Sequence, residues 1–203
     1  TEKLSNVQKG NLWNNLGANY FIQNQFSLAK KAIQNSILLL KNDSSQTKTL
    51  SNSYRNLAKI EVQEKHFEKA KELMEQSRDL FFENPIIEPR QQAQLYYDIA
   101  LVDFQSAHFN ESQINLKAAF AVLIPNFSST KSVLPKKNTL YAETVLLDAL
   151  DLQAELFLTQ NQLKKAVESY QLAFHIEDLF QAMLVYENSK IITQIRNRNR
   201  TEK

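Results

Sequence analysis

Residues 13–36 read WNNLGANYFIQNQFSLAKKAIQNS, and their spacing decides the fold. The small residues Gly17 and Ala29 lie twelve positions apart, and a third small residue, Ser36, follows seven positions later. Large apolar residues recur at helical intervals on either side of a turn at Asn24. Small residues at this spacing let two antiparallel helices cross closely, so this stretch predicts a helix pair.

The same spacing occurs three more times along the chain. It is formed by three further sets of small residues: Ala58, Ala70 and Ser77; Ala100, Ser112 and Ala119; and Ala154, Ala166 and Ala173. A fixed offset that recurs at such intervals is the signature of a repeat array, in which each unit buries its apolar face against its neighbours. The last interval is the longest because it contains a loop, predicted over Pro125 to Lys137.

The composition favours an all-α protein. Two glycines and four prolines in 203 residues leave few helix breakers, and no strand alternation of useful length is present. The net charge of +2 is too small to indicate a nucleic-acid or membrane partner. No apolar run reaches the roughly 18 residues of a membrane span. The lack of cysteine excludes disulfides and thiolate metal sites but does not indicate the compartment, which stays unknown, with the cytoplasm favoured.

The units resemble tetratricopeptide repeats (TPRs), a family of paired helices with aromatic and small residues at fixed positions. The first unit matches the family pattern in full, with these residues: Trp13, Leu16, Gly17, Tyr20, Phe26, Ala29, Ile33 and Ser36. Later units depart from it at Glu61 and Asp103, where the family has an aromatic residue, and at Leu150 and Gln153. The resemblance covers about residues 4–180. It implies an all-α, right-handed α-α superhelix (TPR solenoid) of four helix pairs plus a C-terminal helix.

We predict repeats over about residues 4–42, 45–84, 88–125 and 138–180 and a C-terminal helix over about 185–200, which together form a single TPR solenoid spanning 1–203. The chain begins with Thr1 rather than Met, which we interpret as a fragment of a longer protein. The repeat spacing resembles the long-helix subtype of kinesin light chains. The same subtype occurs in bacterial proteins that carry a caspase-like CHAT peptidase domain, and residues 166–190 resemble the segment that joins repeats to that domain.

In this family the first helix of each pair lines a concave groove. The resemblance places these side chains along it: Asn11, Asn14, Asn52, Arg55, Lys59, Tyr97, Gln105, Asp151 and Glu155. Asparagine amides can pair with both the N–H and the C=O of an extended peptide. Arg55 and Lys59, one helical turn apart, can hold a carboxylate, and Tyr97 offers a rigid anchor. The alternative is an ordinary solvated helix face. Four nearby apolar residues are expected to pack between helices instead: Phe21, Val62, Phe104 and Leu158.

No motif indicates catalysis. The only glycines, Gly10 and Gly17, do not form a phosphate-binding loop, and no Ser/His/Asp set can be found. His66 and His108 hold the same turn position in two units and lack a second ligand four residues on, so neither a metal nor a cofactor is predicted. The basic stretch Arg196–Arg200 is interpreted as a helix C-terminus that meets the helix dipole, rather than as a nucleic-acid patch.

The sequence therefore favours a non-catalytic protein-protein interaction scaffold that binds a peptide or partner segment in its groove. Nucleic acid, membrane and cofactors are not expected as partners. Two alternatives stay open. In the first, the chain is the regulatory or sensing arm of a larger CHAT-type peptidase or bacterial signalling protein, whose catalytic domain lies beyond Lys203. In the second, exposed end faces of the array form a homodimer.

Overall fold

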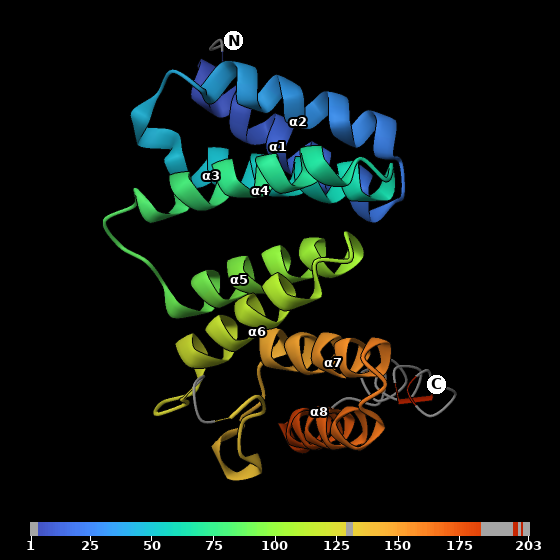
Figure 1. The fold of residues 1–203 in the computed structure, drawn as a ribbon. Coiled ribbons are helices and arrows are strands. Elements are labelled where there is room, and N and C mark those ends of the chain that lie inside the picture. Colours follow the sequence, from blue (N-terminus) through green and yellow to red (C-terminus); the bar gives the residue numbers. More distant parts are fainter. Residues whose placement is uncertain (1–3, 129–131, 184–196, 199, 201–203) are drawn as a thin grey trace. The chain divides into compact units, whose positions relative to one another are not determined.

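The structure is a computed structural model that describes residues 4–128 and 132–183, together with Asn197, Arg198 and Arg200. Every regular element in these ranges is helical, and the predicted all-α fold of four helix pairs is confirmed (Figure 1). The pairs are α1 (Asn6–Ile22) with α2 (Phe26–Leu40), α3 (Thr47–Gln63) with α4 (Phe67–Phe82), α5 (Pro89–Gln105) with α6 (Phe109–Leu123), and α7 (Thr144–Thr159) with α8 (Leu163–Met183). None of the described helices is long and apolar enough to cross a membrane.

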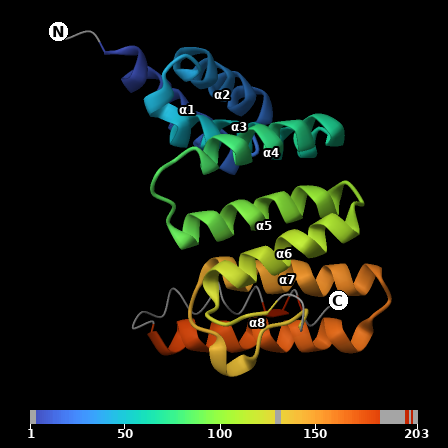
Figure 2. The same ribbon diagram turned by 60° about the vertical axis from the view of Figure 1, so that its left-hand side comes forward.

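The helices group into two compact units. The first spans Thr1–Ile87 with Gln105–Ala107, and the second spans Glu88–Phe104 with His108–Lys203. In the first unit α1 packs along α2 and α3 packs along α4, while α3 also contacts both α1 and α2 (Figure 2). In the second unit α7 packs along α8 and contacts α6. Each unit therefore buries its helix pairs against one another, as expected for a repeat array.

The small residues lie where paired helices cross, as the spacing predicts. A Cβ atom built on Gly17 would lie 2.4 Å from Ile33 Cγ1 and 3.3 Å from the carbonyl oxygen of Ala29. Ser112 Oγ donates a 2.8 Å hydrogen bond to the carbonyl oxygen of Ala100, twelve positions earlier, so the two backbones are close. The other members of the pattern are at most 1% exposed: Ala29, Ala58, Ala70, Ala154 and Ala166.

A left-handed residue closes each turn between paired helices. These residues are Asn24 (φ 58°), Lys65 (φ 63°), Ala107 (φ 61°) and Asn161 (φ 57°). In every turn the next amide N–H donates to a carbonyl five residues earlier, at 2.8 to 2.9 Å. This arrangement satisfies carbonyls at the end of the first helix and lets the chain reverse within a few residues.

Three polar residues that break the apolar repeat pattern are buried, and each has a polar partner on a neighbouring helix. Glu61 and Gln153 are 0% exposed and Asp103 is 5% exposed. Asn115 Nδ2 on α6 donates to Asp103 Oδ2 on α5 at 2.9 Å. Gln113 on α6 and Gln153 on α7 exchange two amide hydrogen bonds, of 2.6 and 3.0 Å. The departures from the family pattern therefore join adjacent helices through polar pairs.

The loop predicted over Pro125 to Lys137 is longer in the structure, because α7 begins only at Thr144. The extra segment takes part in the core of the second unit: Leu134 and Leu140 are at most 9% exposed and belong to its apolar cluster. Glu143 then caps α7, with its Oε1 accepting from the N–H two residues on at 3.1 Å. Two separated leucines in an irregular segment have no helical period, so the pattern could not predict their burial.

The expected C-terminal helix over about residues 185–200 and the end of the CHAT-like stretch over 166–190 lie largely outside the described residues. Helix α8 continues to Met183, beyond the expected end of the fourth pair.

Candidate functional site

The polar residues predicted to contact a partner in the first unit lie on α1 and α3, which touch each other. Ser53 Oγ on α3 donates a 3.0 Å hydrogen bond to Asn14 Oδ1 on α1. Arg55 Nη2 donates a 2.9 Å bond to Asn52 Oδ1, one turn earlier on α3. Asn14, Asn52 and Arg55 are all half-buried. The first helices of this unit therefore carry amide and guanidinium groups that are held in place by short hydrogen bonds.

Two further predicted residues of this face are also half-buried. Asn11 lies on α1, and its Oδ1 is shielded from solvent without a hydrogen-bond partner among the described residues. A shielded oxygen of this kind gains from any donor that reaches it. Lys59 lies on α3, one turn after Arg55. The five residues Asn11, Asn14, Asn52, Arg55 and Lys59 are called the amide-basic face below.

The predicted residues on α5 have a different environment. Tyr97 is half-buried and packs against the apolar core of the second unit. Gln105, at the C-terminal end of α5, is exposed. Tyr97 therefore has a packing role in addition to any contact with a partner, and its removal would disturb the core.

Asp151 and Glu155, the predicted acidic residues on α7, both bind groups of this chain. Tyr170 on α8 donates its hydroxyl to Glu155 Oε1 at 2.7 Å. Arg200 contacts Asp151 in a bidentate manner, with Nε 2.7 Å from Oδ1 and Nη2 2.6 Å from Oδ2. Burial, the hydrogen bond to Glu155 and the negative charges of Glu155 and Asp151 raise the pKa of Tyr170, so its hydroxyl remains a donor.

Two residues on α8 complete the surroundings of Arg200. Glu177 is 3% exposed, and its Oε1 lies 2.8 Å from Arg200 Nη1. The ring of Phe174 lies under the guanidinium, with 5.0 Å between the ring centroid and the Arg200 carbon Cζ. Burial alone would lower the pKa of Arg200, but the hydrogen bond to Asp151 and the charges of Asp151 and Glu177 outweigh it and raise that pKa.

The sequence pattern indicates this arrangement only in part. It predicts that Arg200 meets the dipole of a helix end, whereas in the structure Arg200 forms ion pairs with two carboxylates. Tyr170, Phe174 and Glu177 follow one another at intervals of four and three on α8, so one face of that helix is polar and aromatic. The spacing on α8 predicts a polar and aromatic helix face. It does not predict that this face contacts Arg200, which lies 49 positions after its partner Asp151 in the sequence.

Of the four apolar residues expected to pack between helices, three make apolar contacts and the fourth is buried. Phe21 contacts Phe26 and Phe104 contacts Phe109, each pair with ring centroids 5.7 Å apart. Val62 is buried, and Leu158 packs against the core of the second unit.

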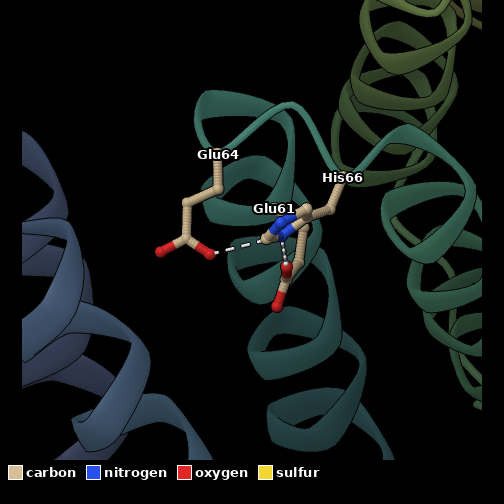
Figure 3. Close-up of side chains that lie close together, drawn as sticks. All are labelled: Glu61, Glu64 and His66. Atoms are coloured by element: carbon tan, nitrogen blue, oxygen red, sulfur yellow. Dashed lines mark hydrogen bonds and ion pairs between the residues drawn. The ribbon is translucent and has the colours of Figure 1, made fainter.

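A second polar cluster surrounds Glu61 at the turn between α3 and α4. His66 Nδ1 lies 2.8 Å from Glu61 Oε2 and 3.5 Å from Glu64 Oε2 (Figure 3). Two lysines also reach Glu61 Oε1, Lys30 at 2.9 Å and Lys69 at 3.0 Å. Lys30 pairs with Glu64 as well, so the cluster links α2, α3 and α4. We call these five residues the Glu61 network.

The basic side chains of the Glu61 network stabilise the negative charge of the Glu61 carboxylate. Burial alone would raise the pKa of Glu61, but the hydrogen bonds from Lys30, Lys69 and His66 outweigh it and lower the pKa to about 2. One oxygen or nitrogen atom from each of Glu61, Glu64 and His66 lies within 4.8 Å of the others, a spacing that can hold a metal ion. Both lysine ammonium groups already contact Glu61, and a cation would have to displace them. The geometry therefore favours an ion-pair network that ties three helices together.

No family model matches the sequence, and no curated protein matches it either. Solved structures do match the fold. The chain is similar to the crystal structure of BtubC (BKLC) from P. vanneervenii, with a TM-score of 0.67 and 14% identity over 92% of this chain and 69% of that one. It is also similar to the crystal structure of MamA, with a TM-score of 0.56 and 12% identity over 85% of this chain and 80% of that one. Both are TPR-like helical-repeat proteins. At these identities the likeness concerns the fold, which is all-α and TPR-like.

Proposed function

We propose that this chain is a non-catalytic protein-interaction scaffold that binds a peptide or partner segment along its first helices. The observation that carries the proposal is the amide-basic face of α1 and α3. Hydrogen bonds from Ser53 and within α3 hold Asn14, Asn52 and Arg55 in defined positions while leaving them partly accessible. A TPR-like fold adds support, since stacked helix pairs form extended binding surfaces.

The chemistry of the amide-basic face suits an extended peptide with an acidic group. Asn11 and Asn14 supply amide groups that can bond the N–H and C=O of a peptide backbone. Arg55 and Lys59 add two positive charges one turn apart, which favour a carboxylate. Because Tyr97 packs against the core of the second unit, Arg55 is the better residue to change in a test.

A site-specific photo-cross-linker tests the proposal. It replaces Arg55 on α3 in one variant and Lys71 on α4 in the control, since both residues are half-buried and basic but Lys71 lies on a second helix. In a lysate of the source organism we expect a discrete protein cross-linked from position 55 and none from position 71. Adding the charge reversal Lys59→Glu to the variant with the cross-linker at position 55 should abolish this capture, while adding Lys71→Glu to the same variant should not. Equal cross-linking from both positions would show that the first helices are not the binding surface.

The second candidate function is regulatory: the chain binds another part of its own protein. This corresponds to the alternative in which it is the regulatory arm of a CHAT-type peptidase or signalling protein. The observation that favours it is Arg200, a residue after the helix pairs that contacts Asp151 on the first helix of the fourth pair. The same cross-linker separates the two candidates in the natural full-length protein. A product within one chain supports the regulatory arm, and a product with a second protein supports the scaffold.

A further inference from the structure

Five side chains on α7 and α8 form a cluster at Arg200, whose guanidinium group contacts three of them directly, while Tyr170 donates to Glu155 within the same cluster. The five are the carboxylates of Asp151, Glu155 and Glu177 and the aromatic rings of Tyr170 and Phe174, and we call them the acidic-aromatic cluster. All three guanidinium nitrogens are engaged: Nε and Nη2 by Asp151, at 2.7 and 2.6 Å, and Nη1 by Glu177, at 2.8 Å. Nη1 also donates to Asn197 Oδ1 at 3.1 Å.

This geometry matches the guanidinium group in shape as well as in charge. Two parallel N–H···O bonds to one carboxylate require the planar fork that arginine has and lysine lacks. The Phe174 ring lies 5.0 Å from Cζ, within the range of a cation–π contact. Glu177 is 3% exposed, and a carboxylate at that depth is costly unless a cation pairs with it. The cluster therefore needs a cation, and its geometry selects arginine.

The position of the cluster connects it to partner binding. Asp151 and Glu155 lie on α7, the first helix of the fourth pair, at positions that the TPR resemblance assigns to the partner-binding side. Arg200 comes from beyond the helix pairs and reaches Asp151 from 49 positions away. The guanidinium bound at Asp151 thus lies on the surface where the resemblance leads us to expect a partner.

We propose that the acidic-aromatic cluster is an arginine-recognition site, occupied in cis by Arg200 and able to take an arginine of a protein partner in its place. The inference rests on the proposed scaffold function and names the chemistry of one of its ligands. Arg200 acts as an internal competitor: a partner must present an arginine and displace it. Because the competitor is tethered, its effective concentration is high, and occupancy of the site by a partner is correspondingly reduced.

A peptide of this chain's own residues 195–203, IRNRNRTEK, serves as the probe, with a fluorescent label and anisotropy as the readout. Added to the full chain, it should bind the Arg200→Ala variant about tenfold or more tightly than the wild type, whose site is already filled. Arg198→Ala is the matched control, since it removes an exposed arginine two positions away and should leave binding at the wild-type level. A peptide with alanine in place of Arg200 should not bind, and adding Asp151→Asn to the Arg200→Ala variant should abolish binding.

Equal affinity for the wild type and Arg200→Ala, or binding unaffected by Asp151→Asn, would overturn the proposal. Far-UV circular dichroism shows whether Arg200→Ala remains folded. If it does not, the Nε–H resonance of Arg200 in the ¹⁵N-labelled wild type is followed instead, assigned by its loss in Arg200→Lys. Excess unlabelled peptide should move this resonance to the position of a free arginine, and a resonance that stays in place contradicts the proposal. If either test contradicts the arginine-recognition site, cross-linking from position 55 can still succeed. The failure of this inference can therefore be told apart from the failure of the scaffold function.

Discussion

At the scale of single residues, Gly17 is a position where the packing leaves no room for one added carbon atom. In an exposed helix, glycine to alanine stabilises by about 1 kcal/mol. Here the new methyl group would lie 2.4 Å from Ile33 Cγ1 and near the α2 backbone. We therefore expect Gly17→Ala to lower the free energy of unfolding by about 1–3 kcal/mol, the usual cost of overpacking. Urea denaturation followed by circular dichroism measures this change.

Asn15→Ala on the exposed side of α1 is the control for Gly17→Ala, and it should be neutral or slightly stabilising. In an Ile33→Ala background the cost of Gly17→Ala should shrink, because the clashing side chain is gone. An unchanged cost in that background would show that the close crossing of α1 and α2 is not what constrains residue 17.

Ala107 offers a change in the opposite direction. It adopts φ 61° at the turn between α5 and α6, and a Cβ atom in the left-handed region costs about 1–2 kcal/mol. Ala107→Gly should therefore raise the free energy of unfolding by up to about 1 kcal/mol, because part of the gain is offset by the greater freedom of glycine in the unfolded chain. Asn24→Gly, at the equivalent turn of the first pair, should gain less because asparagine tolerates this conformation. A loss of stability in Ala107→Gly would contradict the turn geometry.

The residue pattern predicted the small crossing positions but not the left-handed turns. Close contact between two helices excludes large side chains at the crossing. The crossing positions therefore recur in the sequence as small residues at fixed offsets. Lys65 and Ala107 are not residue types that indicate φ > 0, so the left-handed geometry is imposed by the reversal of the chain rather than by local preference.

At the scale of helices, the Glu61 network links α2, α3 and α4. The pKa of Glu61 is lowered to about 2 from its ordinary 4.5, so the folded state binds this proton less readily than the unfolded chain. Its contribution to stability is therefore complete above about pH 4.5 and is lost as the pH falls toward about 2. Glu61→Gln should cost about 1–3 kcal/mol at pH 7, because lysines in the network lose their charged acceptor.

The difference in unfolding free energy between wild type and Glu61→Gln should shrink as the pH falls below about 4.5 toward about 2. Urea titrations at a series of pH values measure it. Glu75→Gln, an exposed change on α4, should show no such dependence. A difference between wild type and Glu61→Gln that stays constant down to pH 3 would mean that the carboxylate of Glu61 is not stabilised in the folded state.

The period of the apolar residues predicts that the helices exist. It does not predict the polar contacts that link one helix to another. The sequence shows Glu61, Asp103 and Gln153 only as departures from an apolar pattern. Their partners lie on other helices, and Gln113 and Gln153 are 40 positions apart. Which helices become neighbours, and in which register, decides whether such a residue is buried and paired, and a local period does not contain that information.

At the scale of the whole molecule, the contacts form two compact units, and in repeat proteins stability is a sum of local terms rather than one global value. The only tryptophan, Trp13, lies on α1 and reports on the first unit, whereas far-UV circular dichroism reports on all helices. Leu150 is 0% exposed in the core of the second unit, and Leu150→Ala should cost about 2–5 kcal/mol there. We expect it to lower the midpoint of the ellipticity transition while the Trp13 fluorescence midpoint moves little.

Gly17→Ala provides the reciprocal control, because it weakens α1 and α2 and should lower the Trp13 midpoint most. Under Leu150→Ala the ellipticity should fall in two steps, with only the second coinciding with the fluorescence change. If both probes instead shift together under either change, the eight helices that the structure describes unfold as one cooperative array. Local stability would then be coupled across the four pairs. The loss of any one helix crossing would destabilise both the amide-basic face and the acidic-aromatic cluster.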